Sequence, residues 1–419
     1  MKMTLKLATI LLAVYAWTNT QAQVVPAATG PSGLPVIGNM SYSMRYSQAA
    51  FLYGGSEGNP VSSILSADVN YVHPNTRLPF NLSYGGGYMW SIAGQSLGTG
   101  VFQHLFVSQG LVQRRWNILA SENVSYTPEA PITGFSGVAG TGEPIGTSGT
   151  SPASGQSILT INTRTLSNAA NLELGYNLNY ATTLNVGGGW QLLRFPDGNG
   201  MDSEGEQANV GITRRLDARN SIAGQYMFSH FSYSASSYDG GVAGSFDTNA
   251  LTVDYQRSWN RQLNTNISVG PQWTSGSDSS LVPPTKTIMV NAAIDYQFKA
   301  ESANLGYNHG INGGAGYLPG ATVDTVTGGL SRLFERTLTI GITGSYERTA
   351  ALENVGGASD ARFGGAQSAM QLGPYFSVFA GYTAIDQSTN LAPQTNVLNQ
   401  LYQVISFGVA YSSREARRR

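Results

Sequence analysis

Apolar and polar residues alternate with a period of two along most of this chain. Between positions 171 and 180, every even position is Leu or Tyr and every odd position is Asn, Glu or Gly. The segments 263–273 and 337–346 repeat the pattern. Successive side chains of a β-strand point to opposite faces, so each run predicts a strand with one apolar and one polar face.

The length of these runs favours strands that cross a membrane. A strand of a globular protein has about 5–6 residues, whereas a transmembrane strand needs about 9–11. A β-sandwich would also alternate, but these runs are longer and no segment of helical period interrupts them. We predict eighteen strands, at 38–47, 62–73, 78–91, 100–112, 115–126, 165–178, 182–194, 206–217, 221–234, 246–258, 263–275, 286–298, 301–310, 321–333, 337–348, 363–372, 375–386 and 400–412.

The links between the predicted strands alternate strictly between short and long. Bacterial outer-membrane barrels show this alternation, with short periplasmic turns and longer extracellular loops. The fold class is therefore an all-β, transmembrane, antiparallel up-and-down β-barrel. An even strand number leaves both termini in the periplasm. The strand at 38–47 is short and has the weakest pattern, and without it and one neighbour the number would be sixteen.

Aromatic residues fall near both ends of the predicted strands. Phe80, Trp116 and Trp259 lie at the periplasmic ends, and Tyr88 and Trp190 lie at the outer ends. Aromatic rings settle at the two membrane–water interfaces, because they are apolar with a polar edge. The aromatic positions support the predicted orientation.

The two ends of the chain predict export. Residues 1–22 combine a short cationic start, an apolar run and a small-residue cleavage site, which indicates a secretory signal peptide. Residues 23–37 are expected to be a periplasmic lead-in, 38–412 the barrel and 413–419 a basic periplasmic tail. No later apolar stretch approaches the ~18 residues of a membrane-spanning helix.

Composition agrees with a barrel in lipid. Only 11% of the residues are charged, against an average near 25%, and 51 of the 419 residues are Gly. The chain has no Cys, which removes thiolate metal sites and thiol chemistry. A net charge of −1 gives no reason to expect a nucleic-acid partner.

The final strand carries a resemblance to porin-type outer-membrane barrels. Phe407, Val409 and Tyr411 alternate along it, and such proteins usually end in an aromatic residue that the barrel assembly machinery reads. Here the tail Ser412–Arg419 follows, which departs from that ending. The resemblance implies an integral protein in the outer membrane of a Gram-negative-type bacterium. Its expected partners are outer-membrane lipids, the assembly machinery and further copies in a homo-oligomer.

The sequence offers little enzymatic chemistry. His73, His104, His230 and His309 show no metal-binding spacing, and no GxSxG motif occurs. A Ser-His-Asp arrangement across strands stays open, but we expect no enzyme and no cofactor. Asp197, Asn199, Asp202 and Glu204 are spaced closely enough to suggest a calcium loop. The EF-hand register is absent, so we expect a solvated turn and no metal.

The polar faces of the strands suggest a hydrated lumen. We expect Val186, Ile267 and Ile340 to face lipid, and Gly187, Asn266 and Gly341 to face the lumen. The lumen-lining candidates are Glu173, Asn177, Gln191, Gln207, Asn209, Asp254, Gln256, Asn264, Asn266, Gln272, Asn291, Asp295, Asn304 and Gln371.

These features predict a channel for small polar solutes, because barrels of 16–18 strands can hold an aqueous channel. A secretion channel for polysaccharide and a non-conducting structural or adhesive barrel are the alternatives. The longest loop, 127–157, is rich in Gly, Ser, Thr and Pro, with Glu129 and Glu143 as its charges. It either folds into the lumen as a constriction or lies on the outer surface.

Overall fold

The computed structural model describes residues 39–53, 61–93, 99–127, 164–198, 200–234, 243–276, 282–313, 318, 320–335, 337–352, 357–390 and 401–413. These residues form strands joined by turns and loop ends. No helix that is long and apolar enough to cross a membrane occurs within these ranges. The predicted signal peptide and lead-in, residues 414–419 of the basic tail, and the loop at 128–163 lie outside the described residues.

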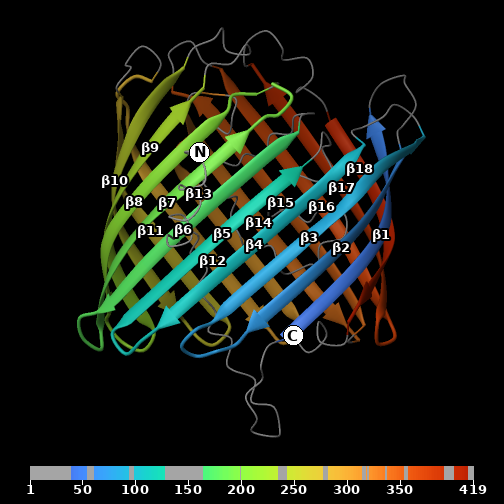
Figure 1. Cartoon of the computed structure of the whole chain (residues 1–419), viewed down its shortest axis with the longest axis horizontal. Helices are drawn as coiled ribbons and strands as arrows, with labels where there is room; N and C mark the ends of the chain where they lie inside the picture. The colour runs from blue at the N-terminus through green and yellow to red at the C-terminus, as the bar shows by residue number, and fades with distance from the viewer. Residues whose placement is uncertain are drawn as a thin grey trace, which may run out of the picture.

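Eighteen antiparallel strands form one closed sheet (Figure 1). Each strand pairs with its neighbours in the chain, and β1 pairs with β18 to complete the ring. The strands are β1 Asn39–Tyr53, β2 Val61–His73, β3 Phe80–Ala93, β4 Gly100–Val112, β5 Trp116–Thr127, β6 Thr165–Asn177, β7 Thr182–Arg194, β8 Ser203–Arg215, β9 Asn220–Tyr233, β10 Gly244–Ser258, β11 Leu263–Gly276, β12 Lys286–Phe298, β13 Glu301–Asn312, β14 Ala321–Phe334, β15 Leu338–Ala351, β16 Ala358–Leu372, β17 Phe376–Thr389 and β18 Leu401–Ser412.

The predicted number of eighteen is confirmed, and the alternative of sixteen is wrong. The uncertain first strand is longer than expected, because β1 pairs with β18 up to Tyr53 and with β2 up to Ala50. Likewise β16 begins at Ala358, five residues before its predicted start at 363. In both cases the additional pairs lie at the loop end, where backbone pairing continues although the alternation of the sequence weakens.

The outside of the barrel is an apolar surface. Val186 is 41% exposed, Ile267 48% and Ile340 41%, and the apolar neighbours along each strand face the same way. Such side chains would be buried in a soluble protein, whereas here they form the band that contacts hydrocarbon. The ring closes through β1 and β18, so none of the eighteen strands stands at a free edge of the sheet, as the bilayer core requires. The chain is therefore an integral β-barrel of the type found in bacterial outer membranes.

The aromatic residues at the strand ends are exposed on the same outer surface. Trp116 is 45% exposed at the start of β5, and Tyr88 is 45% exposed near the outer end of β3. Trp259 follows β10, and the guanidinium carbon of Arg257 lies 3.9 Å from its ring centroid. This arrangement agrees with aromatic girdles at both membrane interfaces.

The short turns at the periplasmic end are stabilised by Asx side chains. Asp217 Oδ1 accepts hydrogen bonds from the backbone N–H groups of Arg219 and Asn220, at 2.6 and 2.9 Å. The Asn220 side chain donates to Asp217 Oδ2 at 2.6 Å, and these bonds hold the pKa of Asp217 below its ordinary value. Asn75 and Asn260 accept backbone hydrogen bonds in the same way. A short polar side chain that bonds to the backbone two residues later stabilises a tight turn.

Candidate functional site: the barrel lumen

The register decides which side chains face the lumen. Directly paired residues of neighbouring strands point to the same side of the sheet. Val186 pairs with Leu174 and Val210, so these three side chains share the outer face. Gly187 pairs with Glu173 and Asn209, which places this row on the inner face.

The same reasoning around the ring places every predicted lumen candidate on the inner face. Most of these side chains are partly buried, Asn177 and Asp295 are exposed, and Gln272 is buried. The inward residues are Glu173, Asn177, Gln191, Gln207, Asn209, Asp254, Gln256, Asn264, Asn266, Gln272, Asn291, Asp295, Asn304 and Gln371.

Glycines on the inner face allow neighbouring polar side chains to lie along the wall. A Cβ added to Gly187 would lie 2.5 Å from Asn209 Oδ1. A Cβ on Gly189 would lie 2.5 Å from Gln207 Nε2, and one on Gly329 would lie 2.6 Å from Asn304 Oδ1. Each of these amides therefore occupies the space above a glycine of the adjacent strand, instead of projecting toward the barrel axis.

A charged group on β1, β2 and β4 was not singled out from the sequence. Arg45 Nη2 lies 3.9 Å from Asp68 Oδ2, which also accepts a hydrogen bond from Ser43 Oγ at 3.1 Å. The His104 ring lies beside Asp68 above Gly85, where an added Cβ would collide with both side chains. Arg45 stands at a polar position between Met44 and Tyr46, so the alternation could have identified it as an inward residue.

The wall from β6 to β12 carries three acidic residues. Glu173 lies on β6, Asp254 on β10 and Asp295 on β12, and no ion pair to any of them occurs among the described residues. Strands β1 and β10 are nine positions apart in the ring of eighteen, so they face each other across the lumen. The lumen therefore has a compensated Arg45–Asp68 pair on one side and uncompensated carboxylates on the other.

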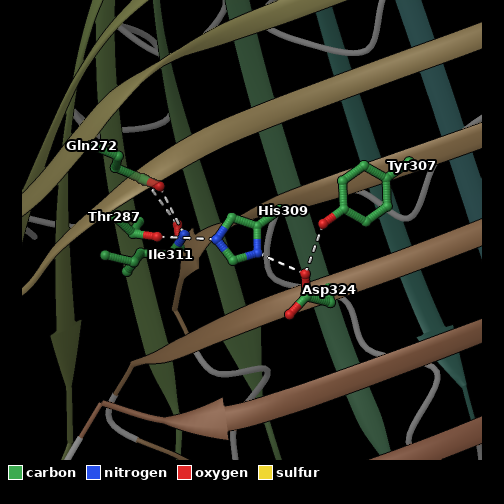
Figure 2. Close-up of polar contacts among 6 residues, drawn as sticks. All are labelled: Gln272, Thr287, Tyr307, His309, Ile311 and Asp324. Atoms are coloured by element: carbon green, nitrogen blue, oxygen red, sulfur yellow. Dashed lines mark hydrogen bonds and ion pairs between the residues drawn. The ribbon is translucent and has the colours of Figure 1, made fainter.

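The Gln272 side chain bridges a gap in the hydrogen-bond ladder between β12 and β13. The β12–β13 ladder ends at the pair Val290–His309, although β12 begins at Lys286 and β13 continues to Asn312. Across this split, Gln272 Nε2 donates to the carbonyl of Ile311 at 3.1 Å (Figure 2). The Ile311 N–H donates to Gln272 Oε1 at 2.8 Å. The Gln272 side-chain amide thus replaces a missing backbone pair, and both of its polar atoms are bonded within the barrel wall.

His309 closes the same split from its other side (Figure 2). Its Nε2 lies 3.0 Å from Thr287 Oγ1 on β12, and its Nδ1 lies 2.6 Å from Asp324 Oδ1 on β14. Tyr307 also donates to Asp324 Oδ1, at 3.0 Å. Hydroxyl, imidazole and carboxylate follow the order of a catalytic triad. The hydroxyl belongs to a β-branched threonine and the chain joins three strands, so we assign it to sealing the wall.

Apolar side chains from several connections pack inside the extracellular end. Phe246 and Phe231 face inward from β10 and β9, with ring centroids 5.1 Å apart. Met201 precedes β8, Val282 precedes β12 and Leu352 follows β15, and all three are buried in this cluster. The described ends of these connections therefore pack against the inner face of the wall. The sequence suggested infolding for the loop 127–157 alone, and residues 128–157 lie outside the described residues.

The acidic residues that follow β7 already accept hydrogen bonds or form ion pairs within the protein. Asp197 forms an ion pair with Arg164, and Asp202 Oδ2 lies 2.9 Å from Arg194 Nη1. Glu204 Oε1 accepts a hydrogen bond from Trp190 Nε1 at 2.5 Å. Asn199 lies outside the described residues, and within them no group of three His, Cys, Asp or Glu side chains could hold a metal ion. The bonds of these carboxylates favour a structured polar turn.

Comparison with known proteins returned similarity to solved structures alone. No protein-family model and no curated protein matches the chain. OpdL of Pseudomonas aeruginosa is 12% identical, with 90% of this chain and 98% of that chain covered and a TM-score of 0.44. OccK2 (OpdF) of the same organism is 12% identical, covering 90% and 97%, with a TM-score of 0.46. OccAB3 of Acinetobacter baumannii is 8% identical, covering 90% and 99%, with a TM-score of 0.45. Identities this low carry no information about the solute.

Proposed function

We propose that this barrel is an outer-membrane channel through which small polar solutes diffuse. The observation that carries the proposal is the inner face, where small residues and amides lie along the wall of a closed ring of eighteen strands. A ring of 16–18 strands is wide enough for an aqueous channel. The mechanism is physical, because a hydrated lumen removes the cost of transferring a polar solute into hydrocarbon.

The apolar cluster around Phe246 fits a channel with a narrowed extracellular entrance. In that arrangement the entrance limits the size of the solute, and the polar wall below it keeps the solute hydrated. A highly charged lumen suited to polysaccharide export is not formed by the described strands. The inner faces carry mostly amides, hydroxyls and glycines.

Single-channel recording in a planar bilayer tests the function. Purified full-length protein that has folded into a barrel is expected to give discrete conductance steps. Swelling of proteoliposomes in small sugars, but not in large dextrans, would show diffusion of small polar solutes. A folded barrel that gives no steps and no swelling would favour a structural or adhesive role instead.

We further propose that the chain matures and inserts as its ends suggest. Cleavage after about Ala22 would leave 23–37 as a periplasmic lead-in and 413–419 as a basic periplasmic tail. Assembly machinery, outer-membrane lipids and further copies of the chain are the proposed partners, and no catalytic role is assigned. The mass of the protein extracted from outer membranes tests the cleavage, and its mobility under mild detergent tests the oligomer.

A further inference from the structure

Three inward carboxylates lie at nearly the same height in the lumen. Glu173 stands four residues before the end of β6, Asp254 four before the end of β10, and Asp295 three before the end of β12. A strand tilted by about 40° rises roughly 2.5 Å per residue along the barrel axis, so all three lie roughly 8–10 Å above the periplasmic ends. Because they stand on separate strands, they form a charged arc around one side of the lumen.

The carboxylates in this arc face the lumen without a cationic partner among the described residues. Asp295 is exposed, whereas Glu173 and Asp254 are partly buried, and Asp254 Oδ1 is buried without a hydrogen-bond partner among the described residues. Glu173 pairs in register with Gly187, which carries no side chain that could donate to it. None of the three is neutralised by an ion pair within the described ranges.

The inward cations do not offset this arc. On the described strands, the inward-facing arginines are Arg45 and Arg215. Arg45 lies on β1, far from Asp254 and Asp295 in the ring, and its Nη2 is 3.9 Å from Asp68 Oδ2 on the adjacent β2. Arg215 stands at the periplasmic end of β8, where its Nη2 donates to the carbonyl of Tyr180 at 3.1 Å. The periplasmic half of the lumen therefore carries an excess of negative charge.

We propose that Glu173, Asp254 and Asp295 make the channel selective for cations, so that its preferred solutes are small polar molecules bearing an ammonium or similar positive group. This inference rests on the proposed channel function. Rings of Asp and Glu side chains select cations in channels by their electrostatic field. Such a field extends over about 10 Å at 0.1 M salt and about 3 Å at 1 M, so the selectivity depends on ionic strength.

Reversal potentials in a KCl gradient test the proposal with the full chain. The protein is expected to pass K⁺ in preference to Cl⁻, more strongly near 0.1 M than near 1 M salt. The variant Glu173→Gln/Asp254→Asn/Asp295→Asn should keep its conductance steps. Its permeability ratio should fall by about two- to fivefold, since a unit charge within a few ångströms in water changes an ion's population by about that factor. The three substitutions are isosteric, so the barrel is expected to assemble.

Glu206→Gln is the matched control, because Glu206 is an exposed carboxylate on the outer face, paired with Trp190 and His230. It should leave the permeability ratio unchanged. Asp295→Asn alone serves if the triple variant fails to fold, because this side chain is exposed. Steps without a preference for K⁺, or an unchanged ratio in the charge-neutral variants, would overturn the selectivity and leave the channel function standing. A folded barrel without steps would overturn both.

Discussion

At the scale of single residues, the lumen is shaped by where side chains are absent. Gly187, Gly189 and Gly329 lie under amide side chains from neighbouring strands. Each pairing lets a polar group cover the wall without entering the path of a solute. A Cβ at any of these positions would force the neighbouring amide to rotate, and the open direction is toward the lumen.

Gly187→Ala is therefore expected to lower single-channel conductance by moving Asn209 away from the wall. The double variant Gly187→Ala/Asn209→Ala should recover the conductance, because it removes the displaced amide. Gly224→Ala is the control, since Gly224 faces outward and an added Cβ would meet no atom within 4 Å. Equal conductance of Gly187→Ala and the unmodified protein would show that these amides do not narrow the lumen.

The two faces of a strand also predict opposite responses to charge. Ile340 faces lipid, whereas Thr339 pairs with Leu333 and Ala369 on the inner face. An arginine at a lipid-facing midplane position costs about 2–4 kcal/mol, and one in a hydrated lumen costs far less. Ile340→Arg should reduce the folded fraction much more than Thr339→Arg. Densitometry of folded and unfolded bands after refolding into detergent measures this, and equal losses would refute the register.

At the scale of elements, the weak point of the wall is the upper part of the β12–β13 boundary. The direct ladder stops at Val290 and His309, and side chains close the remaining split. Gln272 provides two hydrogen bonds to the backbone of Ile311, and the Thr287–His309–Asp324 chain provides the others. Side chains that stand in for backbone pairs hold the top of β13 against the inner face of its neighbours.

Gln272→Ala should destabilise the barrel, because it leaves the N–H and carbonyl of Ile311 buried without their partner. An unsatisfied buried group costs about 1–3 kcal/mol, so a loss of about this size in the free energy of unfolding is expected. Urea unfolding in lipid vesicles would measure it. Asn308→Ala on β13, the strand of Ile311, is the control, since that inward side chain is exposed, and it should change the stability little.

At the scale of the whole molecule, closure is what makes the fold possible in a membrane. Strands β1 and β18 pair from Ser43–Ser412 to Tyr53–Tyr402, so the ring has no free edge along this boundary. A closed ring satisfies the backbone hydrogen bonds that a bilayer cannot. The first and last strands, β1 and β18, therefore lie side by side although they are far apart in sequence (Figure 1).

Closed barrels resist detergent, so the folded protein should migrate differently on SDS gels before and after boiling. Removing β1, residues 39–53, should abolish this difference, because β2 and β18 would lose their common partner. Deletion of the lead-in, residues 23–37, is the control and should keep the difference in mobility. Identical mobility of boiled and unboiled full-length protein would contradict a closed barrel.

The sequence by itself determined the barrel fold, the order of the strands and their faces, and it limited their number to eighteen or sixteen. Period-two alternation and the contrast of short and long links are local properties, and a one-residue slip would place Val186 and its equivalents in the lumen. The same alternation placed the fourteen polar candidates on the inner face, and it could have placed Arg45 and Asp68 there too.

Only the tertiary structure decided what those inward side chains do. The alternation could not show that Asn209 lies above Gly187, that Gln272 bonds to Ile311, or that loop residues pack on Phe246. Each of these contacts joins residues that are separated in the chain and depends on the register between strands. Nor does the chain order reveal that Glu173, Asp254 and Asp295 share one height along the lumen wall, because that height depends on where each strand ends and on how the ring closes.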